Sequence, residues 1–237
     1  MISFIIPTFN EERALEKTLT SLLSYSGEHE TIVSDDKSTD ATVTIAKKYT
    51  DKVVVNERNE HNIAANRNRG AKLAKGEYLV FVDSDVTIPD SNRFFKKAEE
   101  VFRSKKIVAL TVFNRVEPLL ETTGDKIIIG FFNYFFLLLN NFLYLGASSG
   151  KFQMIRADAF WEVQGFDENL ITGEDQDLFR RLSKKGRTYL LKDFSIYYSG
   201  RRAHAIGWPR LLWQWTRDTI AVLLLRRSMS REWKDVR

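Results

Sequence analysis

The sequence predicts an α/β fold in which a mostly parallel central sheet carries helices on both faces. Strand-like and helix-like segments alternate four times within the first ninety residues, and this alternation is typical of parallel strands joined by right-handed helical crossovers. One segment, residues 78–82, reads Tyr-Leu-Val-Phe-Val, as expected of a strand covered on both faces. An apolar content of 43% and a charged content of 28% fit a globular chain.

The expected elements follow one another without a Pro/Gly/Ser-rich linker, so we read one domain with a variable second half. A first helix begins near Glu11 with Asn10 as its cap. A second helix has Ala41, Ile45 and Tyr49 among its inner residues, and another helix is capped by Asp90 or Ser91. The expected strands span residues 2–6, 30–34, 53–55, 78–82 and 107–116, and a further helix spans 63–74.

Residues 126–146 form a long apolar segment that raises the question of a membrane span. Asn133, Asn140 and Asn141 interrupt it, and a single span would separate two halves of one candidate site. We therefore expect a helix that is buried on one side and touches a membrane or a partner on the other. A fully buried core helix is the alternative.

The C-terminal segment is basic and rich in tryptophan. From residue 201 onward nine Lys/Arg side chains oppose three Asp/Glu, within a net charge of +5 for the whole chain. Residues 208–227 combine Trp and Leu with Arg, which is the composition of an amphipathic helix at a membrane interface. An ordinary solvated helix packed on the domain is the alternative reading.

The chain contains no cysteine, which excludes disulfides, thiolate zinc sites and cysteine nucleophiles and is compatible with a reducing compartment. It opens on a strand-like segment with no signal-peptide pattern. We therefore expect a cytoplasmic protein that is peripheral at the cytoplasmic membrane face. Arginines that alternate with Trp and Leu do not make the polar basic face of a nucleic-acid binder, so we expect no nucleic-acid partner.

Five polar clusters follow expected strands or begin expected helices. The clusters are Pro7-Thr8-Phe9-Asn10-Glu11, Asp35-Asp36-Lys37-Ser38-Thr39-Asp40, Asn66-Arg67-Asn68-Arg69-Gly70, Asp83-Ser84-Asp85 and Gly173-Glu174-Asp175-Gln176-Asp177. The carboxyl ends of strands are where open α/β sheets bind ligands. Ordinary turns, helix caps and solvated arginines are the structural alternatives.

Each cluster carries a different chemistry. Asp83 and Asp85 would repel each other unless a cation lies between them, and a hard divalent metal with oxygen ligands meets that need. A carboxylate of the second cluster can accept the N–H of a pyrimidine ring, with Asp40 the more structural member. Glu174 and Asp175 begin a helix whose dipole favours the ionised form, which keeps a carboxylate available as a base.

The order and spacing of these motifs, together with Gly165-Phe166-Asp167-Glu168, resemble family 2 glycosyltransferases with the GT-A fold. The resemblance covers about residues 1–200 and implies a nucleotide-sugar-binding half (1–116), an acceptor and catalytic half (117–200) and a separate C-terminal helix (201–237). Two residues depart from the family pattern, because Lys37 and Gln164 stand where glycine is common.

The resemblance also implies roles for individual residues. Pro7, Thr8 and Glu11 would line the nucleotide pocket, Asp35 and Asp36 would hold the base and ribose, and Arg67 would lie near the nucleotide or its diphosphate. Asp83 and Ser84 would contact the donor. A divalent Mn or Mg ion would lie on Asp83 and Asp85, with His204 in the tail as a further candidate ligand. Asp175 matches the general base, and Glu174 would help to bind the acceptor.

The implied activity is an inverting transfer of a sugar from a nucleoside-diphosphate sugar to a hydroxyl of a glycan or a lipid-linked acceptor. A nucleotidyltransferase would carry an early glycine-rich triphosphate loop, and residues 7–11 contain no glycine. A non-catalytic nucleotide-sugar or membrane-surface binding module stays open as the alternative.

Overall fold

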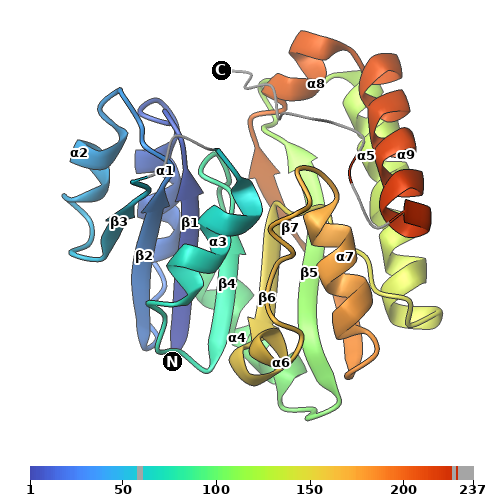
Figure 1. Ribbon diagram of the computed structural model, residues 1–237, viewed down its shortest axis with the longest axis horizontal. Helices are drawn as coiled ribbons and strands as arrows, with labels where there is room; N and C mark the ends of the chain where they lie inside the picture. Colours follow the sequence, from blue (N-terminus) through green and yellow to red (C-terminus); the bar gives the residue numbers. More distant parts are fainter. Residues whose placement is uncertain (58–60, 226–227, 229–237) are drawn as a thin grey trace.

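The computed structural model describes residues 1–57, 61–225 and 228. Seven strands form one mixed sheet in the order β3-β2-β1-β4-β6-β5-β7 (Figure 1). The strands are β1 (Ile2–Thr8), β2 (His29–Asp35), β3 (Val53–Val55), β4 (Tyr78–Val82), β5 (Ile107–Val116), β6 (Phe152–Arg156) and β7 (Arg187–Tyr198). Only β6 runs antiparallel to its neighbours β4 and β5. The predicted mostly parallel sheet is therefore confirmed.

Helices cover both faces of the sheet, as predicted. The helices α1 (Leu15–Leu23) and α4 (Ser91–Phe102) pack on one face, and α3 (Ile63–Ala71), α6 (Ala157–Glu162) and α7 (Glu174–Leu182) pack on the other. The short α2 (Thr42–Ala46) lies beside α1, next to the β3 edge. This arrangement brings the carboxyl ends of β1, β2 and β4, and the residues that follow them, to one edge of the sheet.

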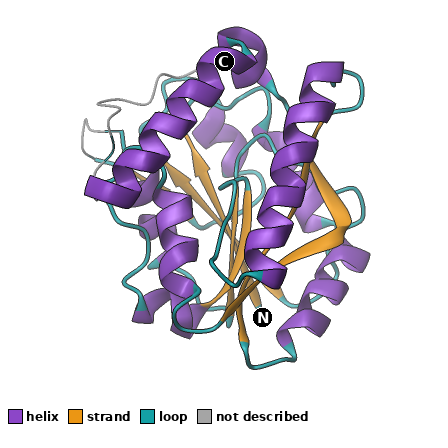
Figure 2. Cartoon of the chain, turned by 90° about the vertical axis from the view of Figure 1, so that its right-hand side faces the viewer, coloured by secondary structure: helices purple, strands orange, loops and turns teal. Residues whose placement is uncertain are grey.

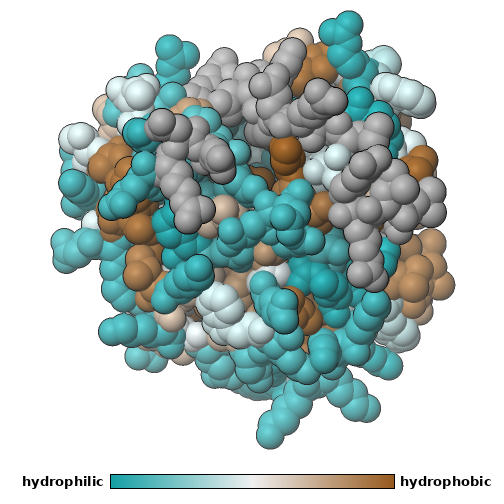
Figure 3. All heavy atoms as spheres, in the orientation of Figure 1, coloured by the Kyte–Doolittle hydropathy of each residue, from teal (hydrophilic) through white to brown (hydrophobic). Residues whose placement is uncertain are grey.

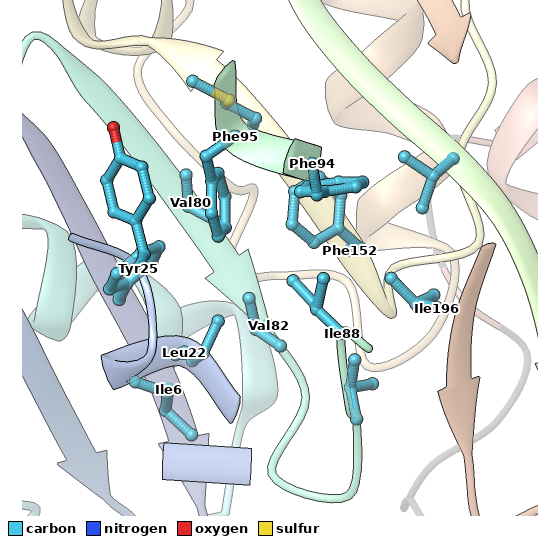
Figure 4. Packing of buried hydrophobic residues seen from close by; sticks show 14 of the residues in the cluster. Ile6, Leu22, Tyr25, Val80, Val82, Ile88, Phe94, Phe95, Phe152 and Ile196 are labelled. Atoms are coloured by element: carbon cyan, nitrogen blue, oxygen red, sulfur yellow. The ribbon is translucent and has the colours of Figure 1, made fainter. Parts of the chain in front are cut away.

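The larger core lies between the sheet and the α1/α4 layer. Figure 4 shows aromatic rings from α4 and β6 packed beside aliphatic side chains from β1, β4 and α1. The rings of Phe94 and Phe152 meet edge to face with centroids 5.1 Å apart, a favoured geometry for buried aromatic pairs. Asp90 accepts a hydrogen bond from the Arg93 amide and caps α4, as the sequence predicts.

The first helix begins later than predicted, at Leu15, and Asn10 does not cap it. Asn10 adopts a left-handed backbone conformation with φ 50°. Its side-chain oxygen accepts from the Thr39 amide at 2.7 Å. Asn10 therefore joins the loop after β1 to the loop after β2, because that tertiary hydrogen bond is available in place of a local cap.

Two further helices lie along the β7 side of the molecule. They are α5 (Thr123–Leu137), which continues as a π-helical turn (Leu138–Phe142), and α9 (Trp208–Leu225), which follows the short α8 (Arg201–Ile206). Figure 1 places α5 and α9 on the same side of the molecule, and Figure 2 shows that the two helices diverge from one end. The ring centroids of Phe132 on α5 and Trp215 on α9 lie 5.8 Å apart. Among the described residues, no helix is long and apolar enough to cross a membrane.

The predicted boundaries at residues 116 and 200 stay predictions. Residues 226–227 of the expected interfacial helix lie outside the described residues.

Candidate functional site

Asp83 and Asp85 follow β4 directly and lie at the ligand edge of the sheet. Asp83 Oδ1 accepts from Arg67 Nη2 at 2.9 Å, and its Oδ2 lies 3.7 Å from Lys151 Nζ. Asp85 Oδ2 accepts from Ser199 Oγ at 2.5 Å and lies 3.9 Å from Arg201 Nε. The two carboxylates are thus compensated by cations from separate parts of the chain.

The environment of Asp85 favours its ionised form. Burial alone would raise the pKa of this carboxyl, but Lys151, Arg201 and the hydrogen bond from Ser199 lower it below the ordinary value. Asp85 therefore presents a charged oxygen donor at the strand end.

Arg67 is buried beneath the site and joins its two acidic parts. Its Nη1 donates to Glu174 Oε1 at 2.7 Å, and its Nη2 donates to Asp83 and to the Gly150 carbonyl. We expected Arg67 beside the nucleotide or its diphosphate. That expectation stays a prediction; in the structure its guanidinium donates to two carboxylates and a carbonyl, and it holds α7 against the end of β4.

Asp175 occupies the first turn of α7, beside the loop that precedes β6. A Cβ added at Gly150 would lie 2.5 Å from Asp175 Oδ2, so only glycine leaves this carboxylate its space. Gly150 also has a φ of +78°, a conformation that favours glycine. Gln176 donates to the Ser148 carbonyl and fastens the same loop to α7.

The pKa of Asp175 is raised to about 7, mainly by burial and then by the charge of Glu174. Burial also raises the pKa of Glu174, although Arg67 opposes the shift. The sequence argument named the helix dipole, which favours the ionised form of these carboxyls. Burial and the neighbouring carboxylate act on Asp175 in the opposite direction and raise its pKa.

Glu174 and Asp175 differ in how much of their surface solvent can reach. Glu174 is buried and paired with Arg67, whereas part of Asp175 stays exposed. The expected role of Glu174 in binding the acceptor stays a prediction, and its observed contact is the one with Arg67.

Thr8 and Asp35 form a buried support at the ends of β1 and β2. Thr8 Oγ1 donates to Asp35 Oδ2 at 2.9 Å, and the Ser38 amide donates to Asp35 Oδ1 at 2.8 Å. Pro7, Thr8 and Asp35 are all buried. These contacts order the loop after β2, and the expected direct contacts of these three residues with a nucleotide stay predictions.

Asp36, in the same loop, accepts hydrogen bonds from residues that follow β3. Its carboxylate accepts from Asn56 Nδ2 at 2.7 Å and from the Asn62 amide at 3.2 Å, with His61 Nδ1 at 3.3 Å. The rings of His61 and Phe9 lie 4.1 Å apart. Asp36 is therefore surrounded by polar donors and a pair of rings, which is a suitable environment for a nitrogenous base.

Glu11 is joined to the C-terminal part of the chain. Arg201, at the start of α8, makes a bidentate ion pair with the Glu11 carboxylate and also approaches Asp85. The pKa of Arg201 is raised, because the hydrogen bonds and charges of Glu11 and Asp85 outweigh the opposing effect of burial. Residues almost two hundred positions apart thus meet at one end of the sheet.

Ser84 lies between the two carboxylates in sequence but turns toward α1, where its carbonyl accepts from Thr18 Oγ1 at 2.7 Å. Its expected contact with the donor stays a prediction.

His204 does not join Asp83 and Asp85 in this structure. Its Nε2 lies 2.8 Å from Asp125 Oδ2, and Trp208 Nε1 donates to the other oxygen of the same buried carboxylate. In the part of the chain that the structure describes, no three His, Asp or Glu side chains converge as a metal cluster. The expected role of His204 as a metal ligand stays a prediction, and its observed partner is Asp125.

The donor set still fits a hard divalent ion. Mg²⁺ is commonly held by one or two carboxylates together with substrate phosphates and water. Asp85, with Asp83 beside it, provides such oxygens at the strand end. These two residues would hold the ion, and no larger protein cage is needed.

Lys151 contacts Asp83, and Ser199 contacts Asp85. Sequence reasoning named Ser199 only as part of a tail, residues 199–204, that resembles the family's diphosphate-closing region, and it did not select Lys151. Lys151 lies at the turn into β6, and only the antiparallel pairing of β4 with β6 brings it to Asp83. Ser199 follows β7, at the far end of the sheet order. The one available sequence signal was their place directly beside Gly150 and Gly200.

Comparison with known proteins identifies the family. The family described as glycosyl transferase family 2 matches residues 3–164, well over half of the chain. The chain belongs to glycosyl transferase family 2. This family 2 chain has the GT-A fold, and it is a glycosyltransferase by membership, so the resemblance read from the motifs is confirmed.

Two relatives illustrate the similarity. A poly(ribitol-phosphate) beta-glucosyltransferase of Bacillus spizizenii is 44% identical over 92 residues, which cover 35% of the family 2 chain and 14% of the relative. The poly(ribitol-phosphate) beta-N-acetylglucosaminyltransferase TarS of Staphylococcus aureus is 28% identical over 214 residues, 84% of the chain and 35% of the relative. The chain thus spans only a minor part of these curated relatives.

Solved structures agree with the fold. TarS residues 1–349 in complex with UDP match with a TM-score of 0.67 and 25% identity, covering 83% of the family 2 chain and 59% of TarS 1–349. A mannosyltransferase of Pyrobaculum calidifontis in complex with GDP-Man and Mn²⁺ matches with a TM-score of 0.72 and 17% identity, covering 97% of the family 2 chain and 65% of the mannosyltransferase.

Proposed function

We propose that this glycosyltransferase moves a sugar from a UDP-sugar to an acceptor hydroxyl with inversion at the anomeric carbon, and that Asp175 is the general base. The observation that carries the proposal is the position of Asp175 in the first turn of α7, where its pKa is raised to about 7. Arg67 links the start of this helix to Asp83 at the end of β4. A base is most effective when its pKa lies near the working pH.

The donor is placed by the residues after β1, β2 and β4. Asp36 is the residue proposed to accept the N–H of uracil, because it already accepts from amide donors beside the Phe9 and His61 rings. TarS, the relative solved with UDP, supports uridine as the base. The diphosphate lies toward Asp83 and Asp85 in this proposal, within reach of Lys151 and Arg201.

Asp83 and Asp85 are the residues that would hold a Mn or Mg ion. When bound, such an ion neutralises the negative charge that develops on the departing diphosphate. Lys151 and Arg201 add positive charge at the same place from the protein itself. This chain's own cations therefore assist departure of the leaving group.

Asp175 takes the proton from the acceptor hydroxyl as its oxygen attacks the anomeric carbon from the face opposite the diphosphate. This direct displacement forms no covalent enzyme intermediate. Gly150 keeps the space beside Asp175 Oδ2 open, and Arg67 fixes α7 so that the carboxylate stays at the site. The acceptor is proposed to be a glycan or a lipid-linked glycan, and two relatives act by name on poly(ribitol-phosphate).

A donor panel tests the proposed function. UDP-glucose, UDP-N-acetylglucosamine, GDP-mannose and a nucleoside triphosphate are each incubated with the chain and Mn²⁺ or Mg²⁺, and release of free nucleotide is measured. We expect release of UDP that is lost on removal of the ion with EDTA. Release of GDP alone, or of pyrophosphate from the triphosphate, would contradict the proposal.

A further inference from the structure

The outer face of helix α5 is apolar, and two of its polar side chains are buried. Phe131 is 65% exposed and Tyr134 is 66% exposed, whereas Asp125 and Asn133 lie buried beside Ile129. Surface helices of globular proteins normally show the opposite arrangement, with the apolar stripe toward the core. An exposed apolar face of this kind is stabilised when an apolar environment covers it.

Hydrogen bonds fix the helix in this orientation. Asn133 accepts from the Asn114 amide at 3.0 Å and donates to the Asn114 carbonyl at 2.9 Å, where β5 extends beyond its pairing with β6. Asn141 makes the same double contact with the backbone of Leu190 on the edge strand β7. A rotation that buried the phenylalanines would leave these backbone groups without partners, which is costly in the interior.

The apolar face continues from α5 through the π-helical turn and onto α9. In Figure 3 brown side chains gather along the right-hand edge, where Figure 1 places α5. We call this surface the aromatic face, and its exposed members are Ile127, Phe131, Tyr134, Phe135, Leu138, Phe142, Leu143, Tyr144, Leu145, Trp213, Trp215 and Ile220. Scattered exposed apolar residues are ordinary, but a contiguous face of this kind marks an interaction site.

The exposed charges on the described parts of α5 and α9 are positive, and the carboxylate nearest to Lys126 is Glu121, 3.9 Å away and just before α5. The acidic residues of α5 and of the part of α9 with described side chains, Asp125 and Asp218, are both buried. Lys126 and Arg210 are exposed on the same helices, and Arg187 stacks over the exposed ring of Tyr144 at 4.4 Å. The sequence after α9 adds five Lys/Arg and two Asp/Glu between residues 226 and 237.

We propose that the aromatic face binds the surface of an anionic phospholipid bilayer, with α5 and α9 lying in the plane of the membrane interface. Amphipathic helices with Trp, Phe and Leu on one side and Lys or Arg around it bind there by burying apolar area and attracting anionic headgroups. Their length and hydropathy do not allow a span. The inference is independent of the transfer chemistry proposed above.

A second copy of the chain fits the face less well. Two copies packed through it would bring Lys126, Arg187 and Arg210 of each copy near the same residues of the other. No exposed carboxylate on the described parts of α5 or α9 would compensate them. Like charges that face each other oppose association. An anionic surface instead complements both properties of the face.

Vesicle flotation of the 237-residue chain tests this proposal without donor or acceptor. Vesicles of phosphatidylcholine alone are compared with vesicles that also contain phosphatidylglycerol. We expect binding to the anionic vesicles that weakens as salt is raised, because charge attraction is screened. The triple variant Phe131→Ser/Phe142→Ser/Trp213→Ser should lower the partition coefficient by at least about tenfold, since burial of large apolar side chains drives insertion.

Two further comparisons make the result specific. The control Leu73→Ser/Trp161→Ser removes side chains that are each 43% exposed outside the aromatic face, and it should bind like the wild-type chain. Lys126→Gln/Arg210→Gln should weaken binding to anionic vesicles by about fivefold per charge and leave binding to neutral vesicles unchanged. Circular dichroism verifies that each variant is folded.

Absence of binding to anionic vesicles would overturn the proposal, as would binding that the triple variant retains. Sedimentation velocity without lipid is expected to show monomers; dimers that the triple variant abolishes, with no vesicle binding, would assign the face to a second copy. UDP release measured in parallel reports on the proposed function, so the two proposals fail separately.

Discussion

Arg67 donates a hydrogen bond to Glu174 at 2.7 Å, and this buried ion pair lies directly beneath the residue proposed as the base. The same guanidinium contacts Asp83, so one cation links the acidic end of β4 to the start of α7. Arg67 thus adds a charged link to the pairing of β4 with β6 and to the hydrogen bonds that Asn68 donates to the Phe166 carbonyl and to Glu168.

Arg67→Met is expected to destabilise the protein by about 3–5 kcal/mol, because it leaves buried carboxylates without their cation. It should also raise the pKa of Asp175 further, since Arg67 lowers that pKa in the wild-type chain. Urea denaturation at pH 8 measures the first effect. Lys72→Met, at the exposed end of the same helix, is the control; equal stability of the two variants would contradict the role of Arg67.

Gly150→Ala should strongly reduce turnover. The added Cβ would lie 2.5 Å from Asp175 Oδ2, and φ at this position is +78°. Gly207→Ala is the control for an alanine at positive φ without the contact, because Gly207 has a φ of +83° and no atom within 4 Å of an added Cβ. Steady-state UDP release by the two variants distinguishes the effect of the contact with Asp175 from the effect of backbone strain. Similar turnover in the two variants would contradict the proposed crowding of Asp175.

Stability should depend on pH through Asp175. This carboxyl has a pKa of about 7 in the folded chain against an ordinary value of 3.8. Between these values the unfolded chain releases the proton first, so the contribution of Asp175 to stability falls as pH rises from about 4 to 7.

Asp175→Asn cannot ionise and should avoid that loss. The variant is expected to melt at a higher temperature than the wild-type chain at pH 8, with the difference shrinking toward pH 4. Calorimetry across this range measures the effect. A difference that stays constant with pH would show that Asp175 titrates normally.

Asp125→Asn should loosen the C-terminal helices and weaken donor binding. Asp125 accepts from Trp208 and contacts His204, and it thereby anchors α8, which carries Arg201 to Glu11. Burial would raise the pKa of Asp125, but the hydrogen bonds of His204, Thr122 and Trp208 lower it, so this anchor is an ionised carboxylate.

Faster hydrogen exchange in residues 201–211 and a raised KM for the donor are the expected readouts for Asp125→Asn. Asp90→Ala removes the side-chain cap of α4 and should cost about 0.5–2 kcal/mol of stability without changing KM. A KM that is unchanged in Asp125→Asn would contradict the link from α5 to Arg201.

The sequence predicted the sheet and the strand-end carboxylates because both leave local signals. Continuous apolar residues mark β4, and Asp83 and Asp85 follow it directly. The two departures from the family pattern also have a structural counterpart. Lys37 and Gln164 replace common glycines, and both adopt positive φ, 69° and 64°, so the glycine preference there reflects backbone conformation.

Contacts between distant segments could not be predicted in the same way. His204 was selected for its chemistry, yet its partner Asp125 lies 79 positions away on α5. Lys151 reaches Asp83 only because β6 inserts antiparallel beside β4. The asparagines of residues 126–146 looked like interruptions of an apolar run, whereas Asn133 and Asn141 pair with strand backbone and turn the apolar side outward.

The most direct test of the account is single-turnover transfer by Asp175→Asn with a UDP-sugar, compared with Asp177→Asn. Asp177 lies on the same helix but bonds Arg181, away from the proposed base. We predict that Asp175→Asn keeps UDP and metal affinity by calorimetry and lowers turnover by about two to four decades, while Asp177→Asn stays near the wild-type rate. Near-normal turnover by Asp175→Asn would contradict the assignment of the base.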